Sequence, residues 1–169
     1  KKILTNNANS YGFSSDDKYV YYIENNKDLH LYNRKTASDT LIDTDVTKFL
    51  DISLNYAIYE KDNCLIVKDT ETGSSDIAAK SYEEIILSKD GKKMLYSNLN
   101  TDESLNYYLY NFVDSSNERI LTDIEELLSY NANFTKFIYT TKTTDTINIY
   151  NNIKDSKASS DKKFVALDK

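Results

Sequence analysis

One short pattern recurs along the chain and limits the folds that the chain can adopt. Each copy has an apolar residue, a polar turn, and then an apolar strand that ends in tyrosine. The four terminal tyrosines, separated by 37, 37 and 43 residues, are Tyr22, Tyr59, Tyr96 and Tyr139. The four copies span residues 13–22, 52–59, 87–96 and 130–139. A spacing near 40 residues indicates an array of similar structural units.

Further short apolar segments accompany each copy, so we predict four strands per unit. The strand after each tyrosine spans 29–33, 65–68, 107–111 and 147–151, and an outer strand follows at 40–42, 76–79, 119–122 and 164–167. An apolar stretch such as 49–52 or 84–87 precedes the pattern. Strands of this length, separated by Asn, Asp, Ser, Thr and Lys, are typical of β-structure. The best helix candidate, 124–128, is too short to stand alone.

These features predict an all-β fold that is β-propeller-like. A four-stranded antiparallel sheet cannot bury both of its faces alone, whereas sheets stacked around an axis cover one another. We therefore predict one domain over 1–169 with about four four-stranded antiparallel blades. The expected blades are approximately 8–43, 44–80, 81–123 and 124–169, with residues 1–7 as an extra outer strand.

Four blades are few for a closed propeller. Residues 1–7 could close the ring by pairing with the last blade, or the chain could be an arc or fragment of a larger propeller. Alternatively, two copies could associate as a homodimer that completes one ring. We favour the arc or fragment, because exposed blade faces would otherwise need capping.

The polar turn carries a family resemblance. Residues 87–92 read Leu-Ser-Lys-Asp-Gly-Lys, and residues 13–18 match with Asp in place of Gly. This pattern resembles TolB-like and WD-like propeller repeats, although the other two copies lack Asp-Gly and the chain has no Trp. The resemblance implies a periplasmic, cell-surface or enzyme-appended module. Because Gly accepts positive φ and Asp bonds its own backbone, Asp90 and Gly91 predict a two-residue hairpin turn.

Charge and composition exclude several classes of protein. The chain has 21 Lys and Arg against 27 Asp and Glu, a formal charge of −6, and only two arginines, which argues against nucleic-acid binding. Its single cysteine excludes an intrachain disulfide and a cysteine-built zinc site. No apolar run approaches the roughly 18 residues of a membrane helix, and no signal-peptide pattern opens the sequence. The abundance of Asn, Lys, Ile and Tyr indicates an A/T-rich bacterial genome.

Few residues suggest catalysis. His30, the only imidazole, lies between Leu29 and Leu31, and we expect an ordinary strand residue rather than a general base or a metal ligand. No Gly-x-Ser-x-Gly motif presents a serine nucleophile. Cys64 is expected to be a small packing residue. We therefore predict no catalytic, cofactor-binding or metal-binding residue and no cofactor, and the ligand-binding residues are unknown.

The acidic segments have two interpretations. Asp43-Thr44-Asp45, Asp16-Asp17 and Thr101-Asp102-Glu103 offer hard oxygen ligands for calcium, but none follows the EF-hand pattern. We favour turn chemistry for all three. Pairs of Asp and Glu suited to glycoside hydrolysis remain open, since any two blades could bring carboxylates together, and spacing selects no particular pair.

The tyrosines are the strongest indication of binding. The four repeated tyrosines are expected to pack between sheets with the hydroxyl at an edge. Tyr19, Tyr21, Tyr107 and Tyr108 fall outside that register and could be partly exposed binding anchors. Codon bias is the favoured explanation for their number.

Together these observations predict a non-catalytic, acidic propeller module that binds a protein, peptide or glycan through blade loops. The alternative is an accessory propeller domain of a larger hydrolase or peptidase whose catalytic residues lie outside this chain. A purely structural assembly unit is a third possibility. We expect an extracellular, cell-surface or periplasmic location, and the composition leaves a cytoplasmic one open.

Overall fold

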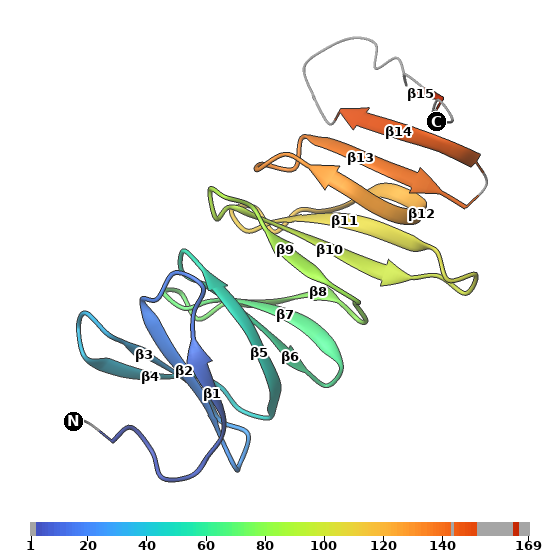
Figure 1. Ribbon diagram of the computed structural model, residues 1–169. Coiled ribbons are helices and arrows are strands. Elements are labelled where there is room, and N and C mark those ends of the chain that lie inside the picture. Colours follow the sequence, from blue (N-terminus) through green and yellow to red (C-terminus); the bar gives the residue numbers. More distant parts are fainter. Residues whose placement is uncertain (1–2, 143, 152–163, 166–169) are drawn as a thin grey trace. The chain divides into compact units, whose positions relative to one another are not determined.

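The computed structural model describes residues 3–142, 144–151 and 164–165 (Figure 1). No residue in these ranges is helical, and all paired strands are antiparallel. The all-β prediction is therefore confirmed. The chain divides into two compact units, Lys1–Ser81 and Tyr82–Lys169.

The first unit contains two four-stranded sheets. One sheet consists of β1 (Ala8–Phe13), β2 (Tyr19–Glu24), β3 (Leu29–Asn33) and β4 (Ser38–Asp43) in that order. The other consists of β5 (Val46–Ser53), β6 (Tyr56–Lys61), β7 (Cys64–Asp69) and β8 (Ser75–Ala79). Each sheet is a meander in which consecutive strands pair, as expected for a propeller blade.

The second unit contains one seven-stranded sheet. Its strands are β9 (Ile85–Leu87), β10 (Lys93–Leu99), β11 (Leu105–Asn111), β12 (Asn117–Tyr130), β13 (Lys136–Thr141), β14 (Thr144–Asn151) and β15 (Phe164–Val165). Of the predicted outer strand 164–167, residues 164 and 165 pair with β14, and residues 166 and 167 lie outside the described residues.

Strand β12 serves two repeats. Ile124 pairs with Leu105 of β11 on one side and with Thr141 of β13 on the other, and Asp123 has a φ of 55°. The outer strand of the third repeat and the first strand of the fourth are thus one continuous, bulged strand. The helix candidate 124–128 lies within this strand: Ile124 pairs on both sides, and Glu126 and Leu127 pair with β13, which satisfies backbone groups that a single helical turn would leave open.

The repeated tyrosines lie at corresponding places in β2, β6, β10 and β13. Tyr22, Tyr59 and Tyr96 are buried, and the half-buried Tyr139 packs against the core of the second unit. The prediction that these tyrosines pack within the fold is confirmed. Each unit has its own apolar core, built from residues such as Leu29 and Phe49 in the first unit and Leu95 and Phe137 in the second.

The predicted extra outer strand over residues 1–7 is wrong for the part of it that the structure describes. Residues 3–7 form no strand, and β1 begins at Ala8. The Asn7 carbonyl accepts a hydrogen bond from the backbone N–H of Asn25, but Ile3 is 66% exposed. A strand requires a continuous partner edge, and this single bond does not supply one.

The Ser-x-Asp turn has the same structure in repeats one and three. The Ser88 hydroxyl donates to Asp90 Oδ1 at 2.7 Å and accepts from the backbone N–H of Lys93 at 2.9 Å. Ser14 makes the same pair of bonds, with Asp16 at 2.9 Å and with the N–H of Tyr19 at 3.1 Å. Both serines are buried, so their hydroxyls stabilise the turn and are not available to a ligand.

The predicted two-residue hairpin at Asp90 and Gly91 is therefore wrong. The backbone N–H of Lys93 donates to the Ser88 hydroxyl and not to a backbone carbonyl of a tighter turn. The loop therefore runs from Ser88 to Lys93. Gly91, with a φ of 70°, ends the turn and donates its N–H to the Ser88 carbonyl. In repeat four, Phe134 takes the corresponding position with a φ of 55°, while the Asn131 side chain replaces the serine.

Candidate functional site

His30 occupies a packing position that the fold repeats. Its ring stacks on Tyr22, the residue opposite it in β2, with centroids 4.8 Å apart and planes 7° apart. In the second unit Tyr108 stacks on Tyr96 in the same register, at 5.1 Å and 9°. This correspondence supports the expectation that His30 is an ordinary strand residue in its packing.

Each stacked pair has a third partner, which hydrogen-bonds to the hydroxyl of the repeated tyrosine. The Tyr22 hydroxyl donates to Asp39 Oδ2 at 2.5 Å, and the Tyr96 hydroxyl donates to Asn117 Oδ1 at 3.0 Å. Burial and the Asp39 carboxylate raise the pKa of Tyr22 well above its ordinary value. His30 Nδ1 lies 3.7 Å from Asp39 Oδ1. The first unit therefore has a carboxylate and an imidazole where the second has an amide and a phenol.

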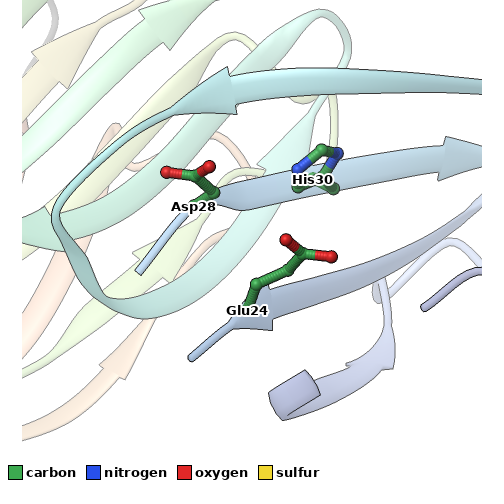
Figure 2. Close-up of side chains that lie close together, drawn as sticks. All are labelled: Glu24, Asp28 and His30. Atoms are coloured by element: carbon green, nitrogen blue, oxygen red, sulfur yellow. The ribbon is translucent and has the colours of Figure 1, made fainter. Parts of the chain in front are cut away.

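Beside this stack, three potential metal ligands converge at the end of the β2–β3 hairpin. Glu24 ends β2, Asp28 precedes β3 and His30 lies within it, and Figure 2 shows their side chains close together. One ligand atom from each lies within 4.8 Å of the others, and all three residues are half-buried. An imidazole with two carboxylates is a donor set suited to a divalent metal ion.

This cluster was not predicted, because the sequence pattern around His30 indicates packing and does not show which carboxylates lie beside the ring. A signal was present: residues 24 and 28 bracket the turn between two predicted strands, and a hairpin brings the ends of its strands together. The prediction that the chain has no metal-binding residue stays a prediction.

The second unit contains an open, polar hollow of about 690 Å³. It lies where the β10–β11 loop meets the bulge of β12, and its lining includes Asn100, Asp102, Asn106, Arg119 and Asp123. A volume of this size is in the range of small-ligand pockets.

An amide network shapes one wall of the hollow. The Asn106 side chain donates to Asn100 Oδ1 at 2.7 Å and accepts from the backbone N–H of Asp123 at 3.3 Å. Arg119, in contrast, is exposed, and no described residue pairs with its guanidinium group. The hollow thus combines a fixed amide wall with a free cationic donor.

The acidic segments serve turns and sheet contacts. Asp43 Oδ2 accepts from the Tyr59 hydroxyl and Oδ1 from Lys61 Nζ. Asp16 caps the Ser14 turn, and Asp102 accepts from both the hydroxyl and the N–H of Ser104. Among the described residues, none of these aspartates belongs to a group of three potential metal ligands. These contacts support the turn interpretation over the calcium interpretation.

Of the four tyrosines outside the repeat register, Tyr19, Tyr21 and Tyr108 are partly exposed, as predicted, and Tyr107 is not. Tyr107, which the sequence offered as a partly exposed anchor, is buried, and its hydroxyl donates to Glu84 at 2.7 Å. Tyr21 packs on Phe49 with ring centroids 4.5 Å apart, and Tyr19 also contacts the core of the first unit.

Cys64 is half-buried and packs against the core of the first unit. This placement agrees with the expected packing role.

No protein-family model matches the sequence, and no curated protein matches it. Among solved structures, the β-propeller domain of the trilobed protease from Pyrococcus furiosus aligns with a TM-score of 0.58 and 13% identity, over 97% of this chain and 59% of that one. Dipeptidyl peptidase 4 from Porphyromonas gingivalis aligns with a TM-score of 0.57 and 9% identity, over 89% and 32%. TolB from Acinetobacter baumannii aligns with a TM-score of 0.49 and 16% identity, over 87% and 41%.

The first two alignments show the fold alone, which is that of a β-propeller. The chain spans between 32% and 59% of the length of the three proteins. The alignment with TolB is too weak to carry an argument, so the TolB-like character of the turn stays a resemblance. Among the described residues there is no helix that could span a membrane.

Proposed function

We propose that this chain is a non-catalytic β-propeller module that binds a glycan in the hollow of its second unit. The observation that supports this function best is the exposed guanidinium of Arg119, which pairs with none of the described residues, beside a fixed amide wall. Sugar hydroxyl groups both donate and accept hydrogen bonds. They therefore match a lining in which Arg119 donates and the carboxylates of Asp102 and Asp123 accept.

A peptide is the weaker candidate for this hollow. An acidic peptide would pair with Arg119 but would meet the carboxylates of Asp102 and Asp123 in the same space. Repulsion between like charges opposes that arrangement. A neutral, hydroxyl-rich ligand avoids it.

The accessory-domain alternative has separate support. Two of the solved structures that share the fold are the β-propeller domain of a protease and a dipeptidyl peptidase, and the chain spans only part of each. This support is an analogy between folds, since propellers host many functions. Under this alternative the catalytic residues lie outside the chain, and activity assays on the longer protein test it.

An NMR titration of the intact chain tests glycan binding. We would add neutral oligosaccharides (maltotriose, cellotriose and diacetylchitobiose) and, separately, an acidic tetrapeptide. We expect an oligosaccharide to shift the amide signals of residues 100–106 and 119–123. Arg119→Gln should weaken its binding about tenfold or more, because a hydrogen bond from a charged donor is lost.

Arg34→Gln is the matched control. Arg34 is the other arginine and lies in the first unit, where it donates to the Asp17 carbonyl and packs over Phe13. This variant should bind the oligosaccharide as the wild type does. Shifts at residues 100–106 with the tetrapeptide alone, or equal affinities for Arg119→Gln and the wild type, would contradict the proposal.

For the assembly of the propeller we propose an arc within a larger propeller, and a homodimer that completes one ring is the alternative. A second copy that completes a ring predicts a stable dimer mass under native conditions, whereas an arc within a larger propeller predicts a monomer.

A further inference from the structure

The end of the β2–β3 hairpin has a geometry fixed by its backbone. The Glu24 N–H donates to the Asp28 carbonyl at 2.9 Å, and the Lys27 N–H donates to the Glu24 carbonyl at 2.9 Å. Tyr22 and His30 are paired across the same two strands. The side chains of Glu24, Asp28 and His30 therefore start from backbone positions held by the sheet, which favours a preorganised site.

Each carboxylate in the cluster has one oxygen held and one free. Glu24 Oε1 accepts from the Thr5 hydroxyl at 2.8 Å, and Asp28 Oδ2 accepts from the Asn26 side-chain amide at 2.8 Å. No described residue donates to Glu24 Oε2 or Asp28 Oδ1. Carboxylates that bind metals are commonly oriented in this way by hydrogen bonds from outer residues.

The surroundings of the His30 imidazole also suit a metal ligand. His30 Nδ1 is buried and has no hydrogen-bond partner among the described residues. The Asp39 carboxylate lies 3.7 Å from it. A carboxylate beside one nitrogen of a histidine is the usual companion of a metal-binding imidazole, because it orients the ring and raises its basicity.

The repeats show that packing alone does not require these ligands. The residues that correspond to His30 are Ile66, Tyr108 and Asn148, each opposite its repeat's tyrosine. Those that correspond to Glu24, two residues beyond that tyrosine, are Lys61, Asn98 and Thr141. The acid and the imidazole coincide in the first repeat only.

We propose that Glu24, Asp28 and His30 bind one divalent first-row transition-metal ion. One oxygen of each carboxylate and one imidazole nitrogen would bind the ion, and water would complete its coordination. Nitrogen and carboxylate ligands together suit Zn²⁺ and its neighbours, whereas Ca²⁺ takes six to eight oxygen ligands. The ligand atoms already lie within 4.8 Å of one another, so small movements of the side chains would bring them to the spacing that a bound ion needs.

This site goes beyond the proposed glycan binding and lies in the other unit. The two proposals can therefore fail separately.

Because His30 is the only histidine, its ring signals report on the site without ambiguity. We would titrate the intact chain with Zn²⁺, follow the His30 ring protons by NMR and measure affinity by calorimetry. We expect one equivalent of Zn²⁺ to shift both ring signals.

The informative variant is His30→Tyr, because Tyr108 shows that a tyrosine at this position keeps the stack. Glu24→Gln removes a carboxylate with little change of shape. We expect each variant to weaken Zn²⁺ binding about tenfold or more, with an unchanged backbone amide spectrum elsewhere. Cys64→Ser, which removes the only thiol, should bind as the wild type does.

Two outcomes would overturn the proposal. One is equal Zn²⁺ affinity for the wild type and His30→Tyr. The other is a wild-type chain whose His30 ring signals do not move with Zn²⁺. A parallel titration with Ca²⁺, which prefers oxygen ligands, should leave the His30 ring signals in place.

Discussion

The Tyr59 hydroxyl donates a 2.5 Å hydrogen bond to Asp43 Oδ2 and so joins the two sheets of the first unit. Tyr59 lies in β6, and Asp43 is the last residue of β4. Lys61 Nζ reaches the same carboxylate at 3.0 Å, and Lys68 Nζ reaches the Ile42 carbonyl at 2.6 Å. Polar contacts thus border the apolar core that the two sheets share.

Removal of the Tyr59 hydroxyl should lower the stability of the first unit. Tyr59→Phe keeps the buried ring but leaves Asp43 with one donor fewer. We expect a loss of about 1.5–3 kcal/mol in the free energy of unfolding, as is usual for a hydrogen bond to a charged group. Urea denaturation of both proteins measures the difference. Tyr11→Phe is the control, because Tyr11 is 75% exposed, and it should unfold as the wild type does. Equal stability of Tyr59→Phe and the wild type would show that the contact contributes nothing.

The same contact predicts a pH dependence. Burial alone would raise the pKa of Asp43, but hydrogen bonds from Tyr59, Lys61 and the N–H of Thr44 together lower it below its ordinary value. A lowered pKa in the folded state adds stability above the unfolded pKa of about 3.9. This stability is lost as the pH falls through the folded pKa.

The stability advantage of the wild type over Asp43→Asn should therefore be full at neutral pH and shrink below about pH 4. Urea denaturation of both proteins across this range measures it. An advantage that stays constant down to the acid limit would contradict the role assigned to the ionised Asp43.

The turns predict opposite effects for two substitutions at corresponding positions. Gly91 and Asp17 both have positive φ, 70° and 59°, at the end of their Ser-x-Asp turns. Gly91→Val should destabilise the fold by about 1 kcal/mol or more, because a β-branched side chain is strained there. Asp17→Gly relieves a left-handed strain of roughly 1–2 kcal/mol, which exceeds the added freedom of the unfolded chain of about 0.4–1 kcal/mol, so it should stabilise the fold. Thermal unfolding shows whether each variant is more or less stable than the wild type. If both variants change the stability in the same direction, backbone strain does not determine the stability of these turns.

Much of the fold could be predicted from the sequence because its signals are local. The repeated tyrosine, the Ser-x-Asp turn and the short apolar segments each depend on residues within one hairpin. The long strand β12 could not be predicted, because Thr122 and Asp123 look like a boundary between strands. In the structure they form a bulge, which is held by an N–H of Asp123 that donates to Asn106, a residue on the neighbouring strand.

The candidate sites were harder to predict than the strands. The hollow around Arg119 depends on that bulge, and therefore on the contact between Asp123 and Asn106. The spacing of residues in the sequence does not reveal this contact. The metal cluster depends on hairpin closure between Glu24 and Asp28, which the predicted strands implied. Its imidazole was assigned to packing, and the stack of His30 on Tyr22 supports that assignment as one of two roles.

One small antiparallel sheet recurs along the chain with the same register around each repeated tyrosine. Proton–proton contacts between strands, measured by NMR on the labelled chain, test this recurrence. Each repeated tyrosine should lie opposite one residue of the following strand, in the pairs Tyr22–His30, Tyr59–Ile66, Tyr96–Tyr108 and Tyr139–Asn148. Contacts that place these tyrosines opposite unrelated positions, or helical contacts over residues 124–128, would contradict it.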